Sequence, residues 1–366
     1  MIADNEHPAY LSEQLITYIG NKRALLHFIG QGLDMVRQRL GKERIASLDV
    51  FSGSGVVARY LKRYSERLVA NDLELYSYII NSCYLANQNT LDKEELEYWH
   101  GWLISQLTEE KLVPGFISEL YAPKDMNHIQ KGERCFYTPR NARYIDTART
   151  LIEQVPQPLR HYFIAPLLAE ASVHANTAGV FKGFYKNTET GTGQFGGKKG
   201  DALTRILGPI NLPMPIFSNY ESHVAVYQED ANRLVDQIDE VDLAYLDPPY
   251  NQHPYGSNYF MLNLIAEYQR PESVSPVSGI PENWRRSAYN SRQEAYRALS
   301  ELTERIKAKY LLISFNSEGY IPLQDMVSLL NRIGRTEVLE SRYNTFRGSR
   351  NLKNRPIHVT EYLYLV

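Results

Sequence analysis

Apolar positions in the first ninety residues switch between helical spacing and short strand-like runs. Between residues 21 and 39 they recur every three or four positions, which predicts an amphipathic helix. Residues 45–51 predict a buried strand, and a glycine turn separates it from a second helix at residues 56–64. A short strand at residues 67–70 and a helix at residues 76–87 follow. This order of elements is typical of a parallel sheet with right-handed crossovers.

The pattern changes between about residues 91 and 215. This stretch begins with helical spacing and then becomes rich in loops. Residues 187–200, NTETGTGQFGGKKG, contain five glycines and show no apolar periodicity. Three prolines, Pro209, Pro213 and Pro215, mark the end of the stretch. We therefore predict that residues 91–215 form a module inserted into a larger domain.

Alternating elements resume after the insert. We predict strands at residues 223–227, 241–246 and 310–315, helices at 259–268 and 294–307, and two final strand-like runs at 337–343 and 359–366. Together with the first third, they predict one doubly wound α/β domain built from residues 1–90 and 216–366.

Composition excludes several classes of protein. The 366 residues are 43% hydrophobic and 22% charged, as in ordinary soluble domains. The two cysteines, Cys83 and Cys135, lie far apart, which argues against a disulfide framework and a cysteine-based zinc site, and we expect no metal. There is no signal-peptide pattern and no apolar run of about 20 residues. We expect a cytoplasmic protein with no membrane partner.

Net charge is uninformative at −2, but basic residues cluster locally. Residues 341–360 contain five basic and no acidic side chains. A second group of basic residues comprises Lys182, Lys186, Lys198, Lys199 and Arg205. Such patches can dock phosphate on a protein that is otherwise neutral. Two solvated loops would show the same charge pattern, so charge alone leaves both readings open.

A glycine turn follows the first predicted strand. Residues 48–55 read LDVFSGSG, and Gly53 and Gly55 let the backbone turn tightly and approach a ligand. Asp72 ends the next strand, where its carboxylate can accept hydrogen bonds from ribose hydroxyls. The same pattern fits a dinucleotide fingerprint, so by itself it leaves nicotinamide cofactors and S-adenosylmethionine equally open.

A second motif, Asp247-Pro248-Pro249-Tyr250, follows the strand at residues 241–246. The prolines remove backbone donors, so carbonyl oxygens remain as acceptors beside the Asp247 carboxylate. Two acceptors on an aromatic amine would favour a pyramidal nitrogen with a localised lone pair, and Tyr250 would stack on the base. Positioning and electrostatic preorganisation would then drive transfer to that nitrogen. A base inside a duplex must be flipped out to reach such a site.

These motifs together resemble the D12 class of adenine-specific DNA methyltransferases, the α group in motif order, which includes Dam-like and restriction-modification enzymes. The resemblance covers about residues 10–90 and 216–366. It implies a Rossmann-like methyltransferase sheet of seven mostly parallel strands with an antiparallel C-terminal strand, and the inserted region would recognise the DNA target. The insert is longer than in many small members of the class.

The resemblance also implies roles for individual residues. Residues 18–22, YIGNK, resemble an element that binds the methionine part of the cofactor, with Lys22 near its carboxylate. Asp230 fits the acid that binds the cofactor adenine. The implied cofactor-binding set is Tyr18, Gly20, Asn21, Lys22, Asp49, Phe51, Gly53, Gly55, Asp72, Asp230, Ala231 and Asp247. The candidate DNA-binding set is Lys182, Lys186, Lys198, Lys199, Tyr255, Tyr259, Asn316, Arg347 and Arg350. Asn176, Thr177 and Gln194 are further candidates for reading base edges.

The implied activity is transfer of a methyl group from S-adenosylmethionine to N6 of adenine in double-stranded DNA. We expect the modification enzyme of a restriction-modification system, working as a monomer or weak dimer beside an independent endonuclease. The shared amine chemistry leaves two alternatives. The substrate could be an RNA base or a protein amide, or the chain could be an inactive DNA-binding relative.

Overall fold

The computed structural model of the chain describes residues 5–13, 15–197, 200, 202–344 and 358–366. Its strands form one seven-stranded sheet in the order β3-β2-β1-β4-β5-β7-β6. The bounds are β1 (Ile45–Asp49), β2 (Ser65–Asn71), β3 (His223–Tyr227), β4 (Val241–Leu246), β5 (Ala308–Asn316), β6 (Glu337–Asn344) and β7 (His358–Leu365). β1 to β5 run parallel, and β7 is antiparallel to β5 and β6. The predicted sheet, mostly parallel with an antiparallel C-terminal strand, is confirmed.

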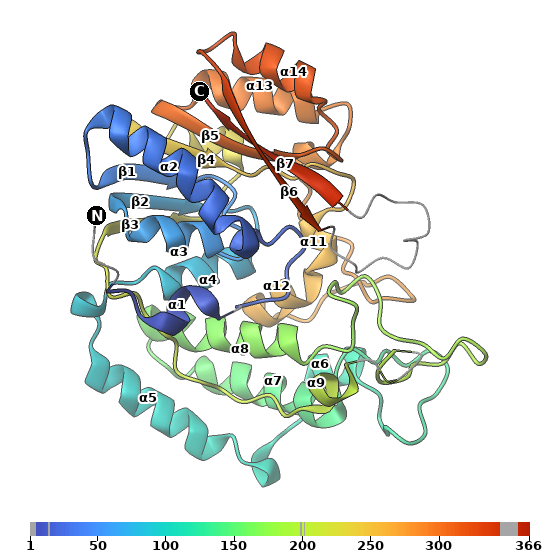
Figure 1. Ribbon diagram of the computed structural model, residues 1–366. Helices are drawn as coiled ribbons and strands as arrows, with labels where there is room; N and C mark the ends of the chain where they lie inside the picture. Colours follow the sequence, from blue (N-terminus) through green and yellow to red (C-terminus); the bar gives the residue numbers. More distant parts are fainter. Residues whose placement is uncertain (1–4, 14, 198–199, 201, 345–357) are drawn as a thin grey trace.

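Helices cover both faces of this sheet, as the doubly wound prediction requires (Figure 1). α2 (Leu26–Leu40) and α3 (Val56–Lys62) pack on one face, where Leu68, Leu243 and Leu312 project. α10 (Ala231–Leu234), α13 (Ala295–Arg305) and α14 (Leu323–Leu330) pack on the other, against Leu48 and Ile313. Because both faces are covered, β4 is buried at all its positions, and this explains its near-continuous apolar sequence.

The region predicted as an insert adds a helical layer beside the sheet (Figure 1). Its helices are α5 (Lys93–Gln106), α6 (Phe116–Tyr121), α7 (Pro139–Ile152), α8 (His161–Val173) and α9 (Leu203–Leu207). α8 packs on α4 (Leu75–Tyr84) and α12 (Phe260–Glu267), so these helices share one apolar cluster with the sheet domain. The boundaries at residues 91 and 215 stay a prediction.

α7 and α8 are regular helices in a region that we predicted to be rich in loops. α8 is apolar on all sides and contains Pro166, so its sequence shows no helical periodicity. The sequence at the start of α7 does contain a helix-capping signal. Thr138 accepts a hydrogen bond from the Asn141 backbone at 3.1 Å, and Pro139 stands in the first turn.

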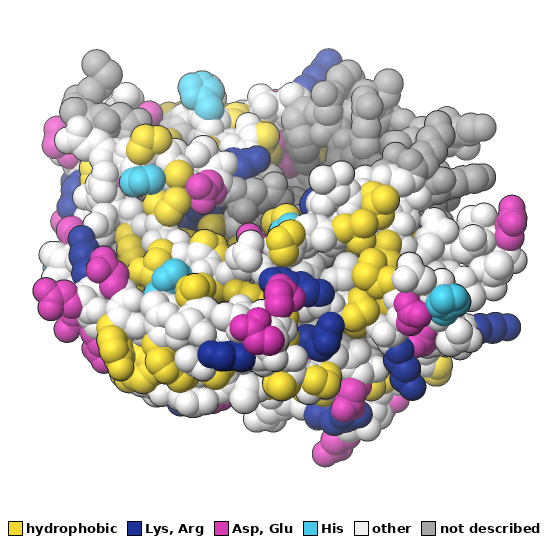
Figure 2. Space-filling view, turned by 90° about the horizontal axis from the view of Figure 1, so that it is seen from below, with side chains coloured by type: hydrophobic (Ala, Val, Ile, Leu, Met, Phe, Trp, Pro, Cys, Tyr) yellow, Lys and Arg dark blue, Asp and Glu magenta, His cyan; other side chains and the backbone are white. Residues whose placement is uncertain are grey.

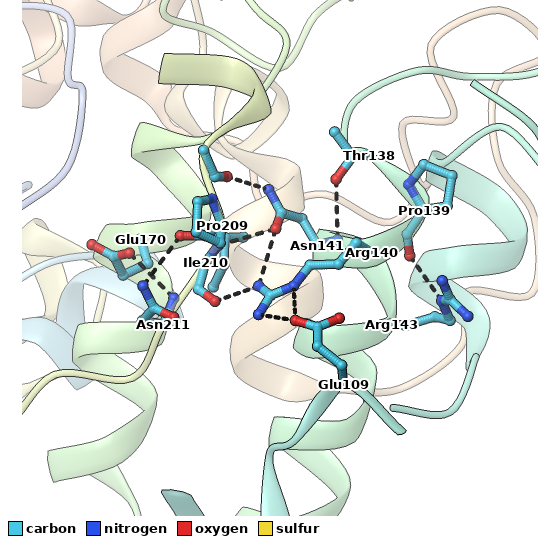
Figure 3. A network of polar contacts seen from close by, with 11 residues as sticks. Glu109, Thr138, Pro139, Arg140, Asn141, Arg143, Glu170, Pro209, Ile210 and Asn211 are labelled. Atoms are coloured by element: carbon cyan, nitrogen blue, oxygen red, sulfur yellow. Dashed lines mark hydrogen bonds and ion pairs between the residues drawn. The ribbon is translucent and has the colours of Figure 1, made fainter. Parts of the chain in front are cut away.

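Polar side chains of α7 anchor the chain where it returns toward the sheet (Figure 3). Asn141 donates to the carbonyl of Gly208 at 2.9 Å and accepts from the backbone of Ile210 at 3.0 Å. Arg140 donates to the Ile210 carbonyl at 2.6 Å and pairs with Glu109 at 2.7 Å. Asn141 is only 1% exposed, so these bonds replace its lost hydration and fix the exit of the helical region.

The sheet order reverses between β1 and β4. β2 and β3 lie on one side of this point and β5 on the other, so the carboxyl ends of β1 and β4 flank a crevice where open α/β sheets bind ligands. Loops at this end gather beside α11 (Tyr255–Asn258), on the right in Figure 1. Within the described residues, no helix is long and apolar enough to cross a membrane.

Candidate active site

Three acidic side chains meet at the crevice because of strand register. Asp49 at the end of β1 is level with Ala70 of β2 and Tyr245 of β4. Asp72 comes two residues after Ala70, and Asp247 comes two residues after Tyr245. The two acids therefore lie just beyond the carboxyl ends of β2 and β4, with the turn after β1 between them. The sequence-predicted acids of three separate motifs are thereby brought to one place.

The glycine turn after β1 is held by backbone bonds and by Asp72. Ser52 donates to the Asn71 carbonyl at 2.8 Å, and Gly53 donates from its backbone to Asp72 Oδ2 at 2.8 Å. Gly53 and Gly55 have φ values of +51° and +75°, which favour glycine. A Cβ on Gly55 would lie 2.7 Å from Asn81, so Gly55 serves the packing of α3, whereas Gly53 faces the cavity.

An aromatic stack forms the wall beside Gly53. Tyr18 lies between Tyr255 and Tyr259, with ring centroids 4.9 Å and 4.8 Å away at interplanar angles of 19° and 23°. Tyr255 lines the cavity, but Tyr259 is fully buried, and its hydroxyl accepts from the Ile19 backbone at 2.7 Å. Tyr259 therefore supports the wall, and the direct DNA contact expected from sequence does not fit this burial.

Lys22 joins the first motif to the catalytic motif. Its Nζ lies 2.9 Å from Asp247 Oδ1 and 3.1 Å from Glu361 Oε1, and its side chain is 5% exposed. Burial by itself lowers the pKa of Lys22, but the two carboxylates outweigh burial and hold it above its ordinary value. Lys22 is therefore a permanent cation at the base of the site.

Asp247 begins the predicted catalytic motif and lines the cavity. Burial, opposed by Lys22 and reinforced by Glu361, raises the pKa of Asp247 to about 6. Pro249 lines the cavity, whereas Pro248 is buried behind it. The Tyr250 ring lies edge-on to Phe315 at 6.1 Å. A buried carboxylate with a raised pKa next to a fixed cation is more typical of a functional site than of a pair that only stabilises the fold.

These motifs line one cavity of about 860 Å³, part of which is open to solvent. Predicted residues in its wall are Tyr18, Gly20, Asn21, Lys22, Asp49, Phe51, Gly53, Asp72, Asp230, Ala231, Asp247, Pro249 and Tyr255. Asp230 also caps α10 by accepting from the Asn232 backbone at 3.0 Å.

The sequence reading missed several wall residues. Glu74, which is 2% exposed and bonded by Asn263 at 2.6 Å, lies only two positions after Asp72 and could have been found by that spacing. Arg285, Ser287, Tyr289 and Asn290 come from an irregular segment without any motif, so no sequence signal pointed to them.

The cavity wall is strongly acidic. Its acids are Asp49, Asp72, Glu74, Glu229, Asp230 and Asp247, whereas its basic residues are Lys22 and Arg285. Asp49 is 1% exposed, and neither of its carboxylate oxygens has a partner in hydrogen-bonding geometry among the described residues. Burial, with Asp247 and Asp72 nearby, raises its pKa. The site is thus suited to a ligand with positive charge.

The candidate DNA-binding residues that the structure describes do not gather in one place as the candidate cofactor-binding residues do. Lys182 and Lys186 are exposed, and Figure 2 shows other basic side chains scattered among acidic ones on one face. Asn176 is fully buried and donates to the carbonyls of Cys135 and Gln194, both at 2.8 Å, so its expected base-reading role does not fit. Thr177 is also buried, at 5% exposure, and Asn316 at 4% accepts from the Glu318 backbone. Lys198, Lys199, Arg347 and Arg350 lie outside the described residues.

Comparison with known proteins identifies the motif set. The sequence model for D12 class N6 adenine-specific DNA methyltransferases matches residues 18–328. The chain is 28% identical over 362 residues to Type II methyltransferase M.NlaIII of Neisseria lactamica, covering 96% of this chain and 99% of that protein. It is 27% identical over 363 residues to Type II methyltransferase M.CviAII of Paramecium bursaria Chlorella virus 1, covering 96% and 98%. Modification methylase LlaI of Lactococcus lactis is 27% identical over 90% of this chain, which spans 51% of that longer protein.

Proposed function

The chain belongs to the D12 class N6 adenine-specific DNA methyltransferases, and from this premise we propose its donor, its catalytic groups and its biological setting. The donor is S-adenosylmethionine, and the acceptor is the N6 amine of an adenine flipped out of duplex DNA. One observation supports this most directly. The glycine turn at Gly53 and the Asp247 carboxylate line the same cavity, so donor and acceptor can meet there.

The charge of the cavity supports S-adenosylmethionine over a dinucleotide. Six acidic and two basic side chains line it, and they would repel a pyrophosphate. Two of the buried acids, Asp49 and Glu74, have raised pKa values that a cationic ligand would relieve. When bound, S-adenosylmethionine supplies a methyl group on a positively charged sulfur. The Gly53 turn, Asp72 and Asp230 would hold its nucleoside part, and Tyr18, Asn21 and Asp49 its methionine part.

Asp247 would prepare the acceptor nitrogen. Its carboxylate and the Pro248 carbonyl would accept the two amine hydrogens, which localises the nitrogen lone pair toward the donor. Lys22 holds the carboxylate from one side at 2.9 Å, so its orientation is set before substrate arrives. Tyr250, with its ring braced by Phe315 at 6.1 Å, would stack on the base.

The DNA side of the proposal rests on exposed basic groups. Lys182 and Lys186 would contact phosphates from the helical region, and Lys186 also lies 5.0 Å from the Phe184 ring centroid. Tyr255 would border the flipped base from the cavity wall. Arg347 and Arg350, which lie outside the described residues, stay further candidates for phosphate contacts. The side chains that read the target sequence would lie within residues 91–215.

The test is incubation with labelled S-adenosylmethionine and unmethylated duplex DNA, followed by nucleoside analysis. We expect label on N6-methyladenine. Asp247→Ala should abolish transfer while the affinity for DNA stays the same, and Asp239→Ala is the matched control because Asp239 is 97% exposed. Label only on cytosine or RNA, or full activity of Asp247→Ala, would contradict the proposal.

We also propose that this enzyme protects DNA against a cognate restriction endonuclease and works as a monomer or weak dimer. The relatives named as type II methyltransferases and modification methylases support this setting. Sequencing of modified bases in DNA from cells that express the chain would give its target site. Resistance of that DNA to endonucleases that cut the same site, and sedimentation of the protein, would test the two parts separately.

A further inference from the structure

Lys22 forms ion pairs with two carboxylates, those of Asp247 and Glu361. Lys22 Nζ contacts Asp247 at 2.9 Å and Glu361 at 3.1 Å. The Lys22 and Glu361 side chains are 5% and 1% exposed, whereas Asp247 is 19% exposed and borders the cavity. One ammonium therefore serves two carboxylates, and only Asp247 faces the place where the acceptor base would bind.

Glu361 is built into the sheet behind this pair. It lies on β7, where it is level with Asn316 of β5. Ser314, also on β5, donates to Glu361 Oε1 at 2.5 Å, and this is the same oxygen that faces Lys22. The other oxygen, Oε2, is buried and has no hydrogen-bond partner among the described residues. The orientation of Glu361 toward Lys22 is thus fixed by the strand and by Ser314.

Stability alone does not explain this arrangement. A buried ammonium is neutralised by one carboxylate, and a second one leaves the cluster with an excess negative charge in a desolvated place. A buried oxygen without a partner adds to the penalty. Charged groups retained against stability in this way are typical of sites where function requires them. The second carboxylate must therefore be judged by what it does to Asp247.

We propose that Glu361 is a positioning residue for methyl transfer, which shares the Lys22 ammonium with Asp247 and so keeps Asp247 a strong acceptor for the substrate amine. This inference rests on the role of Asp247 proposed above. With Glu361 neutral, Lys22 would be paired with Asp247 alone and would withdraw its electron density. Asp247 would then hold the amine hydrogens more weakly, and the nitrogen lone pair would be less localised.

The other titratable groups near Lys22 and Asp247 are neutral near neutral pH, so they do not replace Glu361. Those that face Lys22 or Asp247 are Asp49 on β1, Tyr245 on β4, Tyr250 after β4 and Tyr255 on α11. Burial raises the pKa of each of these tyrosines, so they remain neutral hydroxyls near neutral pH. Burial also raises the pKa of Asp49 and favours its neutral form. Glu361 is then the charge that directly opposes Lys22 in setting Asp247.

The test is single-turnover methyl transfer by Glu361→Gln across a pH range. Glutamine keeps the size and can still accept from Ser314, but it removes the charge. We expect the rate at neutral pH to fall about tenfold, which corresponds to a loss of about 1.4 kcal/mol of transition-state stabilisation. Because Glu361 raises the pKa of Asp247, the acidic limb of the profile should also move to lower pH. Thermal stability should stay equal or rise, since the excess buried charge is gone.

Three further variants make the result decisive. Glu340→Gln makes the same chemical change on the neighbouring strand β6, at an exposed position, and should leave the profile unchanged. Ser314→Ala should move the acidic limb in the same direction by a smaller amount, which keeps the inference testable if Glu361→Gln folds poorly. In a Lys22→Met background, Glu361→Gln should lower the rate by much less than in the wild-type background, because the ammonium that the two carboxylates share is gone.

Each outcome separates the two proposals. If the wild-type protein transfers no methyl group to adenine N6, the proposed function fails and this inference fails with it. If the wild type is active and Glu361→Gln keeps its rate and its pH profile, only the inference is overturned. An equal loss in the Lys22→Met background would also overturn it, because Glu361 would then act by another route.

Discussion

Gly53→Ala tests whether the glycine turn and the aromatic wall form one rigid unit. Gly53 has φ of +51°, and a side chain in that conformation costs about 1–2 kcal/mol. An added Cβ would also lie 2.8 Å from Cε1 of Tyr18. Tyr18 cannot move aside easily, since it is stacked between Tyr255 and Tyr259. Overpacking of this kind costs about 1–3 kcal/mol more.

We therefore expect Gly53→Ala to lower the free energy of unfolding by about 2–5 kcal/mol, a large share of a typical domain's stability. Urea unfolding followed by tryptophan fluorescence would measure it from the midpoint at unchanged slope. The thermal shift produced by S-adenosylmethionine should also be lost, because the turn lines its proposed cavity.

Gly41→Ala is the matched control. Gly41 also has a positive φ, +64°, but an added Cβ there meets nothing within 4 Å. It should pay only the backbone penalty of about 1–2 kcal/mol. In a Tyr18→Ala background, Gly53→Ala should become as mild as the control, because the steric partner is gone. If Gly53→Ala and Gly41→Ala are equally mild in the wild-type background, the rigid wall inferred here does not exist.

Three other predictions concern polar groups. Asn141→Ala should destabilise the fold by about 2–3 kcal/mol in urea unfolding, because the buried Gly208 carbonyl and Ile210 N–H lose their hydrogen-bond partner. It should also weaken the affinity for DNA, measured by gel shift, more than the affinity for the donor, measured by calorimetry. Burial by itself would raise the pKa of Asp242, but hydrogen bonds from the Lys42 side chain, the Ala46 backbone and the Lys309 side chain lower it to about 2. Its stabilisation is thus present at neutral pH and is lost as pH falls through about 4 to 2, so Asp242→Asn should destabilise by about 2 kcal/mol near pH 7 and by about half as much near pH 3. Burial raises the pKa of Asp72 to about 6, so the charged carboxylate disfavours the ligand-free fold above pH 6. Below pH 6 the carboxylate becomes protonated, and calorimetry should show that the affinity for the donor falls. In Asp72→Asn this fall in affinity should be absent.

Much of the fold follows from local patterns. β3 and β4 have the bounds predicted from their apolar runs, and β1 ends two residues earlier than predicted because Val50 and Phe51 already belong to the turn. The predicted helix at residues 259–268 is confirmed as α12, and the short helix α11 just before it was not predicted. α8 was not predicted, because a helix buried on all sides loses the periodicity on which the prediction depends, whereas the capping signal at the start of α7 was present but not used.

The sequence by itself determined the reaction class, because the chemistry depends on short motifs at strand ends. LDVFSGSG and Asp-Pro-Pro-Tyr each combine backbone geometry and functional groups within a few residues, so both could be read without a fold. The order of elements likewise implied a parallel sheet whose strand ends would gather these motifs.

Only the tertiary structure decided which distant residues complete the site. Glu361 lies more than 300 residues from Lys22, yet the antiparallel pairing of β7 with β5 places them 3.1 Å apart. Tyr259 and Asn176 have the residue types of ligand contacts, but packing buries them and assigns their polar atoms to backbone partners. Burial and long-range pairing are properties of the packed chain, and no local pattern of residues encodes them.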